Sequence, residues 1–96
     1  MKIVKYYKGV SLIFEKSNIK HKKYKVKVDS KYTVHFGDNR YKHFKDKIGL
    51  YSNLDHNDPK RRKNYRTRAS KIKNNQGAFT YKIPFTSNWF AYNFLW

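Results

Sequence analysis

The feature that most restricts the fold is a pair of short runs, 24–28 and 32–36, in which apolar and polar residues alternate. This period of two is that of a β-strand with one buried face. The polar pair Asp29-Ser30 between the runs is typical of a tight turn. We therefore predict an antiparallel hairpin over residues 24–36. Its apolar face, which we expect to fill the core, holds Tyr24, Val26, Val28, Tyr32, Val34 and Phe36. Its other face holds Lys25, Lys27, Thr33 and His35.

Two shorter alternating stretches lie within residues 1–19, on either side of Gly9. A polar break over residues 20–23 separates them from the hairpin. Alternation around a central glycine indicates either a second hairpin that extends the sheet or an extended N-terminal arm.

Residues 39–58 are less regular, but three apolar residues in them have helical spacing. Tyr41, Phe44 and Ile48 stand at positions i, i+3 and i+7, which predicts one or two helical turns. Gly49 is expected to end these turns, and the residues after it to form a loop.

A basic helix is predicted over about residues 59–73. Asp58 is a suitable N-cap, and Pro59 fits the first helical position. The end of the helix is expected at residues 74–77, where a glycine can supply the left-handed turn. The apolar stripe is narrow, so most of the helix is solvated or faces a polyanion. Its members stand at i, i+4 and i+7: Tyr65, Ala69 and Ile72.

Residues 78–96 are rich in aromatic side chains, and Ser87 is expected to cap a short final helix. Such a segment is more often core than ligand cage, although it becomes an interface patch if the core is already full. The residues predicted to pack here or at an interface are Tyr65, Trp89, Phe90, Phe94 and Trp96.

These elements predict the α+β class. We expect one small domain over residues 1–96, in which an antiparallel sheet packs against the basic helix and the aromatic segment. The longest apolar run near the N-terminus has three residues, from Leu12 to Phe14. We therefore expect neither a signal peptide nor a membrane span.

The charge is strongly unbalanced. Lys and Arg number 23 against 6 Asp and Glu, which gives a formal net charge of +17. Such a chain repels itself, so we expect an anionic partner: nucleic acid, an anionic membrane face or an acidic protein surface. A/T-rich codon usage is an alternative source of the lysines, but it explains the shortage of acids less well.

The basic helix is the strongest candidate binding element, because residues 59–73 carry eight cations and no acid. It can bind phosphates without recognising the base sequence, or it can bind an acidic protein surface. Two alternatives are a solvated face paired with Asp55 and Asp58, and a nuclear-import signal. The residues predicted to bind anions or nucleic acid are Lys60, Arg61, Arg62, Lys63, Arg66, Arg68, Lys71, Lys73, Lys25 and Lys27.

Nothing in the sequence predicts catalysis, a metal site or a cofactor. There is no cysteine, no Gly-x-Ser-x-Gly nucleophile motif and no pair of histidines at helical ligand spacing. The run Asp55-His56-Asn57-Asp58 leaves a small metal-dependent nuclease, with His35 or His56 as the base, as a weak alternative. The hairpin aromatics could also stack on unpaired bases, but their alternation favours the core.

The ordered motifs resemble a family of small basic proteins of nucleocytoplasmic large DNA viruses. The similar segments are YKVKVDSKYTVHFGD, LYSNLDHNDPKRRKNYRTR and the final FLW, within residues 24–96. The departures are Ala69-Ser70, where relatives often have His-Gly, and residues 1–19, which lie outside the match. The matching positions are His35, Phe36, Gly37, His56, Asp58, Arg61, Arg62, Tyr65, Arg66, Arg68, Leu95 and Trp96.

The family has no assigned activity, so the resemblance implies a viral origin rather than a reaction. We expect a non-enzymatic structural component of a large DNA virus particle, such as a minor capsid or internal virion protein. Its expected partners are capsid proteins and, without sequence preference, the packaged genome. Its expected location is the virion, and the host cytoplasm or nucleus during infection. The main alternative is a free DNA- or RNA-binding protein that acts in packaging or transcription.

Overall fold

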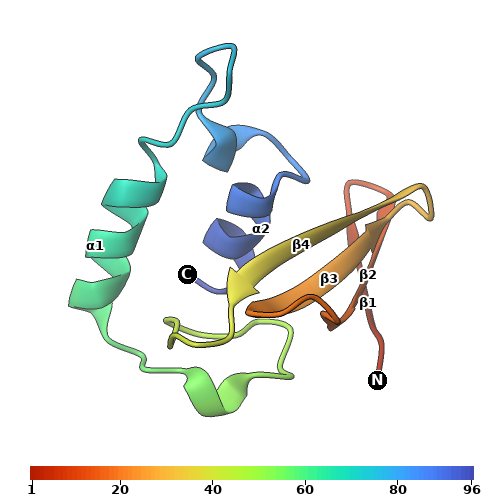
Figure 1. The fold of residues 1–96 in the computed structure, drawn as a ribbon, viewed down its shortest axis with the longest axis horizontal. Coiled ribbons are helices and arrows are strands. Elements are labelled where there is room, and N and C mark those ends of the chain that lie inside the picture. The colour runs from red at the N-terminus through yellow and green to blue at the C-terminus, as the bar shows by residue number, and fades with distance from the viewer.

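The computed structural model describes residues 1–96 and has a four-stranded sheet followed by two helices (Figure 1). Two short 3₁₀ turns, Ser52–Leu54 and Thr80–Lys82, lie in the connecting segments. The strands and helices are β1 (Ile3–Tyr7), β2 (Val10–Lys16), β3 (Lys22–Val28), β4 (Tyr32–Asp38), α1 (Pro59–Ala69) and α2 (Ser87–Phe94).

The sheet is an antiparallel meander in the order β1-β2-β3-β4. The N-terminal residues therefore extend the sheet rather than form a separate arm, and the predicted α+β class is confirmed. The register pairs Tyr24 with Phe36 and Leu12 with Val28, so apolar side chains of neighbouring strands lie on the same face.

The turn of the central hairpin differs from the prediction. It spans residues 29–31 rather than two residues, because Val28 pairs with Tyr32. Asp29 and Ser30 both have positive φ, +52° and +57°, the left-handed geometry that suits the twist of a hairpin. Tyr32 was predicted to be core but is 48% exposed. It stands at the tip of the hairpin, next to the turn.

Helix α2 lies between the sheet and α1, so the molecule has three layers (Figure 1). The core forms where the inner face of the sheet meets α2. Its buried apolar residues come from three strands, α2 and the segments beside it. They are Leu12, Phe14, Tyr24, Val26, Val28, Phe36, Ile48, Trp89, Phe90, Ala91 and Leu95.

Helix α1 begins as predicted and ends earlier. The Asp58 carboxylate accepts from the Lys60 and Arg61 amides, and Pro59 occupies the first turn. The helix stops at Ala69 rather than near residue 73. The following residues leave the helix because Lys73 pairs with Phe79 and the Asn74 side chain caps the loop between them. Ile72, expected on the inner stripe, is consequently 49% exposed.

The one or two helical turns predicted around Tyr41, Phe44 and Ile48 are absent, because residues 39–58 form an irregular loop whose one 3₁₀ turn comes later, at Ser52–Leu54. Two side chains hold it. The Asp46 carboxylate accepts from the amides of Ile48 and Tyr51, and Asp55 accepts from the amide of Asp46. These bonds satisfy backbone donors that a helix would have satisfied internally.

The final helix is present, but its N-cap is Thr86 and not Ser87. The Thr86 hydroxyl accepts from the Trp89 amide. Ser87, the first helical residue, instead donates to the His35 carbonyl oxygen at 2.7 Å. This bond ties α2 to β4.

Gly37 provides a test of the packing between the sheet and the end of α2. It has φ +77°, and a Cβ there would lie 3.0 Å from Leu95 Cδ1 and 3.1 Å from the Lys23 side chain. We expect Gly37→Ala to lower the free energy of unfolding by about 2 kcal/mol, from backbone strain and crowding together. Urea denaturation measures the loss.

Gly9→Ala is the matched control for this prediction. Gly9 has a similar φ of +81°, but nothing lies within 4 Å of its added Cβ. Its substitution should cost only the backbone term, about 1 kcal/mol. Equal losses in the two variants would contradict the close packing at Gly37.

Candidate functional site

Each of the six acidic side chains has a partner within the chain, and most of the cations are left without an acidic partner. Glu15, Asp29 and Asp38 form ion pairs with basic residues. Asp55 binds a histidine, Asp46 accepts three hydrogen bonds, and Asp58 caps α1.

The ion pairs are local and lie away from α1. Asp38 accepts both from Arg40 Nε at 3.0 Å and from its Nη2 at 2.7 Å, and these bonds hold the pKa of Asp38 well below its usual range. A hydrogen bond from Lys25 likewise lowers the pKa of Glu15. Neither Asp55 nor Asp58 pairs with a helix cation. The alternative of a solvated helix neutralised by these two acids therefore has no support in the contacts.

The outer face of α1 is a surface of unpaired cations. Four basic residues of the helix are exposed, and one of them, Arg68, also lines a pocket that residues of α2 border. Asn64 and Thr67, which are neutral and polar, are exposed between them. We call this surface the outer face of α1, and its cations are Lys60, Arg61, Lys63 and Arg68.

The other two arginines of the helix point inward. Arg62 and Arg66 are half-buried, and their Nε atoms donate to the main-chain oxygen of Trp96 at 2.7 Å and 3.2 Å. Their guanidinium groups also lie over the rings of Phe44 and Tyr92, at 4.8 Å and 4.6 Å from the centroids. The structure thus places these two predicted anion-binding residues in the packing between α1 and the last residues.

The aromatic residues predicted to pack do so within the chain. Trp89 and Phe90 are buried, and Phe94 is half-buried against them. Trp96 stacks on Tyr65 with 4.1 Å between ring centroids and an interplanar angle of 8°. Burial raises the pKa of Tyr65. These contacts attach α1 to the end of the chain.

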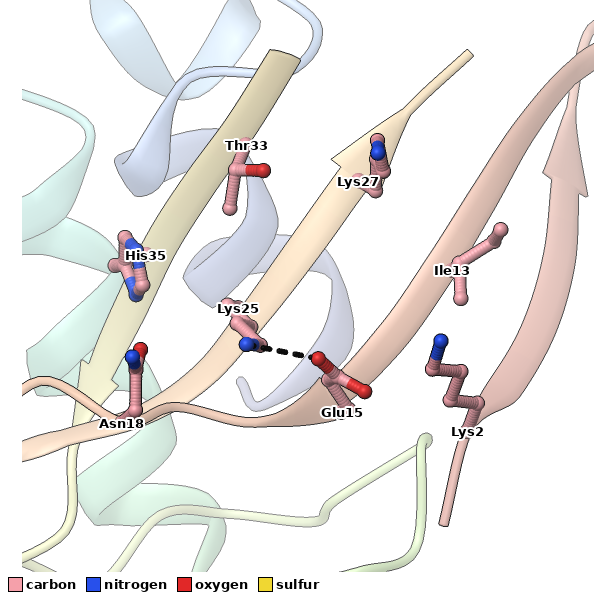
Figure 2. A pocket seen from close by; sticks show the side chains of 8 residues that line it. All are labelled: Lys2, Ile13, Glu15, Asn18, Lys25, Lys27, Thr33 and His35. Carbon is pink, nitrogen blue, oxygen red and sulfur yellow. Dashed lines mark ion pairs between the residues drawn. The ribbon is translucent and has the colours of Figure 1, made fainter. Parts of the chain in front are cut away.

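The remaining predicted cations lie in two other places. Lys71 and Lys73 are exposed in the loop after α1, where Lys73 Nζ lies 5.0 Å from the Phe79 ring. Lys25 and Lys27 project from the open face of the sheet, opposite the helices (Figure 2). Lys25 is paired with Glu15 at 2.8 Å, whereas Lys27 has no acidic partner.

The open face of the sheet carries a shallow pocket of about 410 Å³ (Figure 2). His35, one of the two histidines weighed as a nuclease base, lies on its edge, with Nδ1 2.8 Å from the Ser17 hydroxyl. The other, His56, accepts from the Asp58 amide at Nδ1, and its ring packs against Trp96. The two histidines therefore belong to different surfaces. No group of three or more His, Asp or Glu side chains is placed to hold a metal ion.

The sequence did not predict a buried polar cluster beneath the end of the sheet. Tyr24 donates to Asp46 at 2.5 Å, and His43 Nε2 donates to Asp55 at 2.6 Å. Burial lowers the pKa of His43. Lys23 lies close to this cluster and is almost completely buried. By alternation Lys23 belongs with Lys25 on the open face, so nothing in the local pattern indicated its burial.

Comparison with protein-family models, with curated proteins and with solved structures finds no match. The resemblance of residues 24–96 to small basic proteins of large DNA viruses therefore stays a hypothesis. None of the helices combines the length and the apolar character needed to cross a membrane.

Proposed function

We propose that this protein is a non-enzymatic domain that binds the phosphate backbone of nucleic acid, without sequence preference, through the outer face of α1. The observation that carries the proposal is the group of four exposed cations on α1, none of which forms an ion pair with an acid of the chain. Phosphate contacts of this kind supply most of the affinity of non-specific binding.

The make-up of the outer face favours nucleic acid over an acidic protein. Protein interfaces are centred on buried aromatic or aliphatic anchors. The aromatic residues beside the outer face, Tyr65 and Trp96, are half-buried and stack on each other rather than project as anchors. Between the cations the outer face offers the side-chain amide of Asn64, which can donate to a phosphate oxygen, whereas the Thr67 hydroxyl donates to the Lys63 carbonyl oxygen.

The viral resemblance extends the proposal to a setting. We expect a virion component whose basic surface meets the packaged genome and whose remaining surface meets capsid proteins. Mass spectrometry of purified particles tests this setting separately from the binding. Binding of nucleic acid by a protein that is absent from particles would instead support the alternative, a factor in packaging or transcription.

The test is binding of a labelled random duplex, followed by fluorescence anisotropy across a salt series. We expect log affinity to fall linearly with log salt concentration. The triple variant Lys60→Gln, Arg61→Gln, Lys63→Gln should reduce the slope by about 3, since each lost phosphate contact is worth about 0.9. Arg68 stays in place because it also lines a second pocket.

The matched control removes the same charge from elsewhere. Lys8, Lys20 and Lys82 are exposed and lie outside α1, so their triple change to Gln leaves the outer face intact. This variant should keep most of the slope. An equal reduction in both variants would show that net charge alone drives binding and would overturn the assignment to α1.

A further inference from the structure

We propose that a pocket between the end of the sheet and the two helices is a specific binding site for a terminal phosphate group. The pocket has a volume of about 340 Å³ and is lined from β3, β4, α1 and α2. Four of its lining residues are cations, namely Lys22, Lys23, Lys42 and Arg68. This inference does not depend on the proposed function, because the pocket and the outer face of α1 share only Arg68.

Lys23 is the residue that marks the pocket as a site. It is only 2% exposed, no carboxylate lies within 4 Å of its ammonium group, and that group makes no hydrogen bond. Burial lowers the pKa of Lys23 to about 8, although the charges of Asp46, Asp38 and Asp55 act in the opposite direction. The ammonium is not one of the fully buried polar atoms without a partner, which are His43 Nδ1 and His56 Nε2, so it keeps access to the pocket that Lys23 lines. A charge so poorly solvated favours an opposite charge beside it, and a bound anion would supply one.

The acids near the pocket do not fill that role. Asp38 is the one acid in its lining, and Arg40 holds both of its carboxylate oxygens. Asp46 and Asp55, close to Lys23, already accept hydrogen bonds from Tyr24 and His43. The lining therefore keeps a positive excess, which favours an anion.

The shape and the walls of the pocket favour phosphate attached to a larger molecule. Its volume lies in the range of small-molecule sites. One wall is Tyr65 stacked on Trp96, with the Arg68 guanidinium 5.5 Å from the Tyr65 centroid. An arginine can bind two phosphate oxygens at once, and an aromatic wall suits a flat organic group. A nucleotide and the 5′ end of a nucleic acid strand both present this chemistry.

The first experiment is calorimetric titration of the full chain with inorganic phosphate at constant ionic strength, comparing wild type with Lys23→Met. The variant keeps the length of the side chain and removes the charge from a residue that is only 2% exposed, so we expect it to fold; circular dichroism checks this. Loss of a charged hydrogen-bond partner should weaken phosphate binding by at least about ten-fold. Lys60→Met, on the outer face of α1, should leave phosphate binding unchanged.

Further arms separate the two sources of phosphate. Adenosine 5′-monophosphate that binds more tightly than inorganic phosphate, with no binding of adenosine, indicates a nucleotide site. Preference for a 5′-phosphorylated oligonucleotide over the same strand with a 5′-hydroxyl indicates a strand end. In either case Lys23→Met should bind random duplex like wild type, so failure of this proposal is distinct from failure of the proposed function.

A measurement on the wild type removes dependence on any variant. In amide chemical-shift mapping, phosphate should move the signals of Gly37 and Asn88, which line the pocket. No saturable phosphate binding, an equal loss in Lys23→Met and Lys60→Met, or shifts confined to the outer face of α1 would each overturn the site.

Discussion

Phe14→Ala should lower the free energy of unfolding by about 4 kcal/mol, a large share of the total stability of a small domain. Phe14 is fully buried and lies at the centre of the aromatic core. The rings of Phe36 and Phe90 meet it edge-on, at centroid distances of 6.1 Å and 6.0 Å, and Phe94 lies 5.0 Å away. Removing the ring leaves a cavity that this packing cannot close.

Thermal and urea denaturation followed by tryptophan fluorescence measure this loss. Tyr6→Ala is the control, since Tyr6 is also an aromatic strand residue but is exposed on β1. Its cost should stay within about 0.5 kcal/mol. A loss of less than about 1 kcal/mol in Phe14→Ala would contradict a core centred on this ring.

Asp46→Asn is expected to lower the free energy of unfolding by about 3 kcal/mol. The Asp46 carboxylate accepts from the Tyr24 hydroxyl and from the amides of Ile48 and Tyr51. An amide of the same shape has only one acceptor oxygen, so at least one buried donor faces another donor. The loop that replaces the predicted helical turns depends on these bonds.

The same denaturation measurements test this prediction, with hydrogen exchange of the Ile48 and Tyr51 amides as a local measure. Faster exchange of these amides is expected in the variant. Asp29→Asn is the control, because its ion pair with Lys31 is exposed and asparagine tolerates the left-handed backbone there. Similar losses at positions 29 and 46 would show that the buried bonds of Asp46 contribute little.

The distribution of charged groups connects these stability predictions to function. The few acids hold loops, turns and one helix cap, and none neutralises the outer face of α1. Two of the arginines that the sequence offers for binding instead hold Trp96. A variant that removes every arginine of α1 would therefore confuse loss of binding with loss of packing. The triple variant proposed above avoids this confusion.

The parts of the fold that were predictable from sequence depend on neighbouring residues. The hairpin followed from alternation on both sides of a polar turn, and the start of α1 from the Asp58 cap and Pro59. Alternation and capping each involve residues at most four positions apart, so both can be recognised from the sequence without knowledge of the fold. The positive charge of α1 was predictable too, because residues 59–73 carry eight cations and no acid.

Other features were decided by partners far away in the chain. Arg62 turns inward because Trp96, 34 residues later, offers it a main-chain oxygen. The helix ends at Ala69 because the next residues pair with Phe79 and Thr80. Residues 39–58 form a loop because Asp46 and Asp55 bind amides that a helix would have paired.

The burial of Lys23 is the clearest case of this difference. Its place in an alternating strand predicts an exposed lysine, like Lys25 and Lys27. It is buried because Gly37 on β4 has no side chain, which leaves room for the lysine stem beside Leu95. The sequence by itself determined the strands, the helix start and the excess of positive charge, since these follow from local periodicity and composition. Only the tertiary structure decided which cations are buried, because that depends on the space and the partners that distant residues provide.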